Sequence, residues 1–223
     1  MPIHYMLYRC PRCGHDPLHG QGGRAKCLSC GTRFEQGRGA VIIVRPPEGP
    51  PIQTLASRLI AAVEEMGGPG TKEGFCREAR VAFGRAEGHD VIRWRGQVLG
   101  FSEKISWKGD GLIRLEEEAL TFRPDGRPDG RPSGSAGPEG RDEHSRNVET
   151  FSCHLSDIRG IQISSMALQV TLAGQRLYQF EFLGDSPKRW EDLLCLALRR
   201  LYERSGRCIT EFRPRIVTTM RAR

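Results

Sequence analysis

Two cysteine motifs of the same form constrain the fold of this chain more than any other feature of its sequence. Each has two cysteines separated by two residues and followed by glycine, at residues 10–14 and 27–31, and 13 residues separate Cys13 from Cys27. Two residues between thiolates allow one tight turn to direct both sulfurs at a single ion, and glycine accepts the left-handed conformation that closes such a turn. The spacing therefore predicts one tetrahedral metal site with four thiolate ligands, Cys10, Cys13, Cys27 and Cys30.

Zinc is the metal that we expect at this site, and iron held by four thiolates is the alternative. Four thiolates fill the tetrahedron, so the site is expected to be structural and not catalytic. His15 and His19 lie between the motifs and are assigned to the connecting turn. The N-terminus lacks the charged start, apolar middle and small-residue cleavage site of a secretion signal. We therefore expect a cytoplasmic chain, whose thiols stay available for metal and do not form disulfides.

The segment YRCPRCGHDPLHGQGGRAKCLSCGTRF, with an aromatic residue before the first motif and Phe34 after the second, resembles a zinc ribbon. The resemblance covers about residues 5–45 and assigns residues 1–45 to a zinc-ribbon domain. It implies a small fold with one structural zinc ion, and no particular function.

The length and the distribution of glycine and proline indicate how the rest of the chain is organised. A chain of 223 residues holds one or two small domains, and glycine and proline concentrate in residues 37–51, 67–74 and 123–147. We expect residues 46–89 to form a linker with a helix at 52–66, where apolar residues recur at helical spacing. Residues 123–147 hold five Arg and five Asp or Glu and no large apolar residue, so they are expected to form a flexible loop.

The second half of the chain shows first a strand period and then a helix period. Alternating apolar residues predict a hairpin at 111–122 and strands at 148–155, 158–163, 167–172 and 176–183. The connections are too short for crossover helices, so the strands should be antiparallel, and earlier strands at 91–94 and 97–101 would complete the sheet. Ser186 and Pro187 are then expected to start a helix whose apolar face runs from Trp190 to Leu201.

This order of strands followed by one amphipathic helix resembles the pleckstrin-homology-like (PH-like) superfold, and its GRAM-type members in particular. The matching stretches are GLIRLEEEALTF, FSCHLSDIRGIQI and LYQFEFLGDSPKRWEDLLCLALRRL. The resemblance covers residues 90–204 and leaves 205–223 as a basic tail. The expected fold class is α+β and mostly β, with a small four-cysteine zinc ribbon and a bent antiparallel sheet capped by a C-terminal helix.

Catalytic motifs are missing from the sequence. It contains no G-x-S-x-G, no Walker loop and no H-E-x-x-H, and the acidic run at 116–118 sits at a predicted turn. Cys153 and Cys195 lie in apolar patterns and are expected to pack as small apolar residues, while Cys76 and Cys208 have no partner at a ligand spacing. We therefore expect neither an enzyme nor a small-molecule substrate.

The preferred hypothesis is a cytoplasmic binding or adaptor protein for a protein partner or for an anionic membrane surface, to which it would bind peripherally. The PH-like resemblance implies phosphate contacts near the first strands, where Arg93, Arg95, Lys104 and Lys108 stand with Trp94 and Trp107. The alternative is a nucleic-acid-binding protein that uses the ribbon and the Arg-rich tail, which includes Arg207, Arg213 and Arg215. It ranks second because the four thiolates and Zn²⁺ contribute a charge of −2, which leaves the ribbon only weakly positive.

Overall fold

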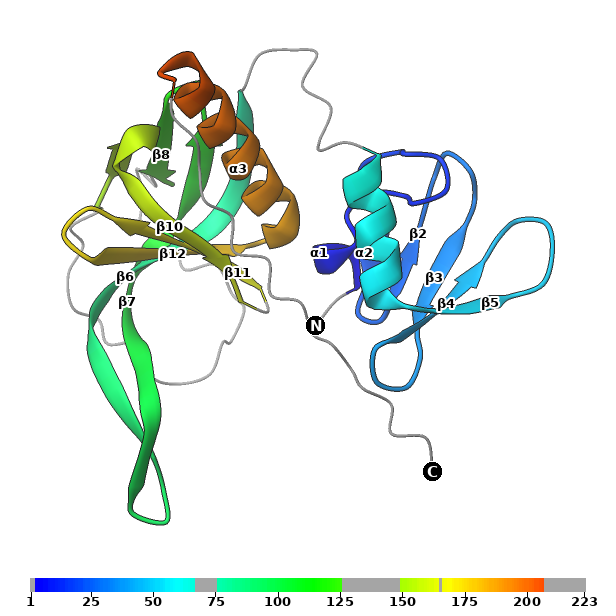
Figure 1. The fold of residues 1–223 in the computed structure, drawn as a ribbon, viewed down its shortest axis with the longest axis horizontal. Coiled ribbons are helices and arrows are strands. Elements are labelled where there is room, and N and C mark those ends of the chain that lie inside the picture. Colours follow the sequence, from blue (N-terminus) through cyan, green and yellow to red (C-terminus); the bar gives the residue numbers. More distant parts are fainter. Residues whose placement is uncertain (1–2, 67–75, 126–148, 165, 207–223) are drawn as a thin grey trace.

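The computed structural model describes residues 3–66, 76–125, 149–164 and 166–206. These residues form two antiparallel sheets, each with its own apolar core, which lie side by side (Figure 1). We call the parts built on them the N-terminal module and the C-terminal module. Most of the predicted tail at 205–223 and most of the predicted loop at 123–147 lie outside the described residues.

The N-terminal module is a sheet of five short strands in sequence order, with two helices packed on it. Each strand pairs with the next along the chain. Ala25, Phe34 and Ile42, one on each of three neighbouring strands, are buried in the core. The elements are α1 (Ile3–Met6), β1 (His19–Gln21), β2 (Arg24–Lys26), β3 (Arg33–Gln36), β4 (Val41–Arg45), β5 (Ile52–Leu55) and α2 (Ala56–Glu65).

The C-terminal module is a seven-stranded antiparallel sheet with the strand order β10-β11-β12-β6-β7-β8-β9. Its strands are β6 (Arg77–Trp94), β7 (Gln97–Leu115), β8 (Ala119–Pro124), β9 (Phe151–His154), β10 (Ile158–Ile163), β11 (Ala167–Leu172) and β12 (Arg176–Phe182). A 3₁₀ turn, Leu155–Asp157, joins β9 to β10, and helix α3 (Pro187–Arg204) follows β12. The expected fold class, a mostly β chain with a four-cysteine sheet and a helix-capped antiparallel sheet, is confirmed.

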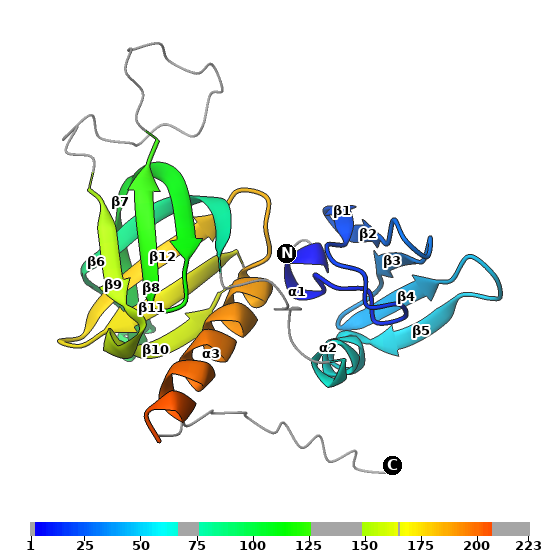
Figure 2. The ribbon, with the colours of Figure 1, turned by 90° about the horizontal axis from the view of Figure 1, so that it is seen from above.

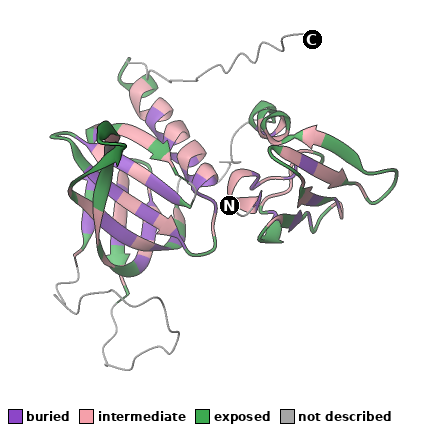
Figure 3. Cartoon of the chain, turned by 90° about the horizontal axis from the view of Figure 1, so that it is seen from below, coloured by how far each residue is buried: buried purple, intermediate pink, exposed green. Residues whose placement is uncertain are grey.

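Helix α3 covers the C-terminal sheet with its apolar face (Figure 2). It begins as predicted, because the Ser186 side chain accepts a hydrogen bond from the backbone N–H of Arg189 and Pro187 occupies the first turn. Trp190 is fully buried and packs beside Phe182. Phenylalanine rings from β6, β8, β9 and β12 fill the centre of the core, which is the purple interior in Figure 3.

The structure differs from the sequence-based boundaries between the two modules. The predicted helix at 52–66 is strand β5 followed by α2, because Ile52 pairs with Val44 and Thr54 pairs with Ile42 at the edge of the first sheet. The expected linker at 46–89 is also largely structured, since β6 begins at Arg77. Ala79, Val81 and Phe83 alternate into the core there, so the second sheet starts well before residue 90.

Strands β6 and β7 extend past the sheet as a two-stranded ribbon, which projects clearly in Figure 1. β12 pairs with β6 only as far as Arg85, and β8 pairs with β7 only from Gly111 onward. Residues 86–94 and 97–105 therefore pair only with each other within the described chain. The predicted strands at 91–94 and 97–101 are the outer ends of this ribbon.

Candidate metal centre and projecting ribbon

Four cysteine sulfurs meet at one point of the N-terminal module. The Sγ atoms of Cys10, Cys13, Cys27 and Cys30 all lie within 4.8 Å of one another. Two pairs are closer: Cys10 and Cys30 are 3.6 Å apart, and Cys13 and Cys27 are 3.5 Å apart. Bonds of ~2.3 Å to a tetrahedral zinc place ligand sulfurs about 3.8 Å apart, so these distances suit a single ion.

Each cysteine motif forms the tight turn that its sequence predicts. The N–H of Gly14 donates to the carbonyl of Cys10 at 2.8 Å, and the N–H of Gly31 donates to that of Cys27 at 3.0 Å. Both glycines have φ values near 70°, a left-handed conformation that residues with a Cβ rarely adopt. The backbone therefore fixes the sulfurs through two matching turns from opposite ends of a short hairpin.

The surroundings of the sulfurs raise the pKa of two of the cysteine thiols and lower the pKa of a third. Burial raises the pKa of the Cys10 and Cys27 thiols above the ordinary value. At Cys30 burial also acts to raise the pKa, but hydrogen bonds from Thr32 and the neighbouring thiols outweigh it and lower the pKa to about 6. The Thr32 hydroxyl, 3.1 Å from the Cys30 sulfur, thus favours the thiolate form that a metal requires.

The donor set fits one structural metal ion. Four sulfur donors in a tetrahedral arrangement are typical of zinc and of iron held by thiolates. His15 and His19 are not part of the cluster, in agreement with their assignment to the connection between the motifs. Four ligands complete a tetrahedron, so the centre has no open coordination position for a substrate or a water.

The four basic residues proposed as anion contacts do not gather at one place. Arg93 and Arg95 stand at the tip of the ribbon, whereas Lys104 lies opposite Gly88, about 16 Å back along the strand at ~3.3 Å per residue. Lys108 lies near the base of the ribbon and forms a 2.6 Å ion pair with Glu87. The register of the hairpin separates the four, and only the first two share a surface.

The tip of the ribbon is apolar as well as basic. Trp94 is 63% exposed and Leu99 is 64% exposed, and the guanidinium of Arg95 lies 5.8 Å from the centre of the Trp94 ring. Three more apolar side chains at the tip are about half exposed: Val91, Ile92 and Val98. Sequence reasoning identified Trp94 and the arginines, but it placed the neighbouring valines and leucine only in strands that would complete the sheet.

The remaining cysteines of the described chain lie apart from the four-cysteine cluster. Cys153 is buried in the core of the C-terminal module, and burial raises the pKa of its thiol to about 11. Cys76 is exposed at the start of β6, and Cys195 is half-buried on α3. Cys208 lies outside the described residues. In the described part of the chain, no helix is long and apolar enough to cross a bilayer.

Comparison with known proteins gives no family to which these features can be referred. No protein-family model matches the chain, and no curated protein is significantly similar to it.

Proposed function

We propose that the protein binds anionic membrane surfaces through the tip of the β6–β7 ribbon. In this proposal a structural zinc ion at the four-cysteine centre stabilises the N-terminal module, and that module acts as an adaptor. The observation that carries the proposal is the group of exposed apolar side chains at the tip, next to Arg93 and Arg95. A PH-like, GRAM-type relationship of the C-terminal module, inferred from the sequence, is consistent with such a role.

The arrangement of the apolar side chains favours a bilayer over a flat protein surface. Val91 lies on one face of the ribbon and Ile92 and Trp94 on the other, because successive side chains of a strand point to opposite faces. Arg93 lies two residues after Val91 and therefore on the same face. Val98 pairs with Arg93, so Val98 lies on that face too. A flat partner covers one face of a ribbon, whereas the interfacial layer of a bilayer surrounds both faces of an inserted tip.

The charge at the tip favours anionic lipid. Residues 91–102 contain Arg93 and Arg95 and no acidic residue. Each basic side chain near an anionic surface contributes about 1 kcal/mol, so the two arginines together contribute roughly a 30-fold increase in affinity. Tryptophan and arginine are side chains that suit the interface between headgroups and acyl chains. The strand from Val91 to Trp94 is about 10 Å long at ~3.3 Å per residue, which matches the depth to which interfacial segments enter that layer.

Co-sedimentation with vesicles tests the proposal. The full chain should pellet with vesicles of phosphatidylcholine and phosphatidylserine at ~0.1 M salt and should stay in the supernatant with phosphatidylcholine alone. The double variant Arg93→Ala, Arg95→Ala should bind about 30-fold more weakly. Arg176→Ala, which removes an exposed arginine outside the ribbon, is the matched control and should bind like the wild type. Equal binding by all three proteins, or by neutral and anionic vesicles, would exclude the tip as a reader of anionic lipid.

A second candidate, nucleic-acid binding by the N-terminal sheet, has one observation in its favour. Lys26 pairs with Arg33, and Arg33 pairs with Arg45, so three exposed cations form one row across β2, β3 and β4. Like charges directly opposite each other destabilise a sheet, and a phosphate backbone would relieve that cost. Arg45 also pairs with Glu35 at 3.1 Å, so only part of the row is free to neutralise phosphates.

The salt dependence of binding tests this second candidate. If the row contacts phosphates, the full chain should bind a fluorescent single-stranded oligonucleotide, and log K should fall linearly with log salt. The variants Lys26→Ala and Arg33→Ala should each reduce that slope by about 0.7, and Arg176→Ala should leave it unchanged. An unchanged slope in the first two variants would remove the sheet from consideration.

A further inference from the structure

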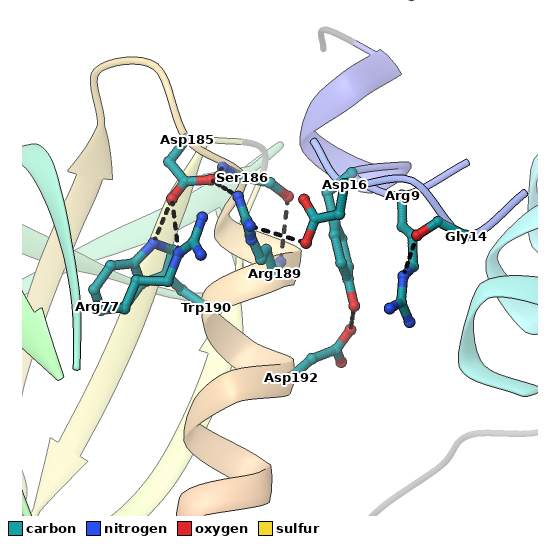
Figure 4. A network of polar contacts seen from close by, with 10 residues as sticks. Arg9, Gly14, Asp16, Arg77, Asp185, Ser186, Arg189, Trp190 and Asp192 are labelled. Atoms are coloured by element: carbon teal, nitrogen blue, oxygen red, sulfur yellow. Dashed lines mark hydrogen bonds and ion pairs between the residues drawn. The ribbon is translucent and has the colours of Figure 1, made fainter. Parts of the chain in front are cut away.

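The loop that carries two metal ligands is also the loop that contacts helix α3 of the other module. Asp16 follows the first cysteine turn, and its carboxylate forms a 2.8 Å ion pair with the guanidinium of Arg189 (Figure 4). The two side chains are only 14% and 7% exposed. This is a buried charge pair that joins residues far apart in the sequence, one from each module.

The C-terminal module holds its half of this contact in place. Asp185 accepts hydrogen bonds from the indole N–H of Trp190 at 3.0 Å and from the Ser186 backbone, and it lies 3.4 Å from Arg189 and 3.8 Å from Arg77. Arg189 is therefore positioned by its own module, and Asp16 approaches it from the other side, as Figure 4 shows.

Further contacts surround the ion pair. The hydroxyl of Tyr8, which is itself buried, donates to the carboxylate of Asp192 at 2.8 Å. The Ser186 hydroxyl donates to the backbone carbonyl of Tyr5. At the other edge, Lys188 lies 3.7 Å from Glu64 of α2. Helix α1 and the first cysteine turn thus rest on the first two turns of α3.

The conformation of this docking loop depends on the cysteine turn. Tyr8 precedes Cys10 by two residues and Asp16 follows Cys13 by three, so the two docking side chains flank the ligands. The N–H of Cys10 donates to the carbonyl of His15 at 2.9 Å, and the Arg9 side chain donates to the carbonyl of Gly14 at 2.8 Å. A metal that joins Cys10 and Cys13 to the second turn fixes the same loop that presents Tyr8 and Asp16.

We propose that metal binding at the four-cysteine centre and docking of the two modules are coupled, so that release of the metal frees the N-terminal module from α3. Without the metal the loop loses the cross-link between its two turns, and Asp16 no longer meets Arg189. Arg189 keeps Asp185, but the Asp16 carboxylate loses its ion-pair partner. A buried charge without a partner is strongly unfavourable, so Asp16 must then reach solvent and the interface opens. The coupling is reciprocal: whatever factor metal adds to docking, docking adds to metal affinity.

Because the coupling is reciprocal, it can be tested through residues that are far from the four cysteines in the sequence and do not contact them. Zinc affinity is measured on the full chain by competition with a chromogenic chelator. Arg189→Met should lower it by a factor of about 5–150, the usual range of such couplings, and Asp192→Ala by about fivefold. Arg176→Met makes the same substitution at an exposed arginine outside the interface and should leave zinc affinity unchanged. Asp192→Ala also serves as a second variant should Arg189→Met fail to fold, because alanine suits a helix.

A nuclear magnetic resonance readout follows the opposite direction of the coupling. The indole N–H of Trp190 is bonded to Asp185 inside the C-terminal module and therefore reports on the interface without belonging to the metal loop. Its resonance should shift when a chelator removes the metal from the wild type, and Arg189→Met should abolish that response. Unchanged zinc affinity in both interface variants, or an unmoved Trp190 resonance on chelation, would overturn the coupling. A wild-type chain that binds no metal would overturn it together with the metal centre, whereas neither result bears on vesicle binding by the ribbon.

Discussion

Replacement of Trp190 should reveal how strongly α3 holds the C-terminal sheet together. The ring is fully buried, packs 5.4 Å from the ring of Phe182, and donates its N–H to the Asp185 carboxylate at 3.0 Å. Removing a buried tryptophan ring costs about 3–5 kcal/mol, and a hydrogen bond to a charged group contributes about 1.5–3 kcal/mol. Trp190→Ala should therefore lose about 3–5 kcal/mol, and Trp190→Phe, which keeps a ring beside Phe182, about half of that.

Urea unfolding followed by far-ultraviolet circular dichroism measures both losses, with the metal kept in excess. The control is Leu183→Ala, because this side chain follows strand β12 directly and is about half exposed. It should lower the free energy of unfolding by less than about 0.5 kcal/mol. A loss below about 1 kcal/mol for Trp190→Ala would refute the packing argument. Equal losses for Trp190→Ala and Trp190→Phe would show that the hydrogen bond to Asp185, and not the ring, is the main contribution.

Three further predictions concern the rest of the described chain. Gly111→Ala should destabilise the protein by more than about 1 kcal/mol in the same urea assay, because a Cβ there would overlap the carbonyl of Arg123 and lie 2.6 Å from the Cα of Pro124. The control Gly100→Ala has open space around the new methyl group and should destabilise the protein less. Cys153, with its pKa raised to about 11, should be only ~0.1% thiolate at pH 8 and should resist iodoacetamide in the folded protein, whereas mass spectrometry should find exposed Cys76 alkylated. Alkylation of Cys153 as fast as that of Cys76 would contradict its burial. Replacing residues 126–147 with a short glycine-serine turn should keep the melting temperature within a few degrees of the wild-type value. The reason is that Phe122 already pairs with Phe151 and that the cost of loop closure changes slowly with length. A large drop in melting temperature would show that the segment stabilises the sheet.

The parts of the structure that were predictable from the sequence are those set by local patterns. The spacing of Cys10, Cys13, Cys27 and Cys30 specified a single site because two residues between thiolates permit one turn geometry. The helix after Ser186 was predictable because its cap, its proline and its apolar period all agree. The later strands followed from alternation, which one buried face imposes on a sheet.

The parts that were not predictable depend on pairing over long distances. Residues 77–90 include Gly84, Gly88 and several charged side chains, so they lack the apolar alternation of a strand throughout, yet they form half of the longest hairpin. Arg93 and Lys108 looked like members of one anion site, but the register of that hairpin places them about 30 Å apart at ~3.3 Å per residue. The contact between Tyr8 and Asp192 spans 184 residues and has no local sequence signal.

The most direct test of the account is whether Trp94 enters the bilayer. Tryptophan fluorescence is recorded as the full chain is titrated with anionic vesicles, some of which contain brominated acyl chains that quench at close range. We expect a blue shift with unlabelled vesicles and strong quenching with brominated ones. Both should vanish in Trp94→Phe, because Trp190 is fully buried and Trp107 lies toward the base of the ribbon. Emission that neither shifts nor is quenched while the protein pellets with the vesicles would place the contact elsewhere and contradict binding through the tip.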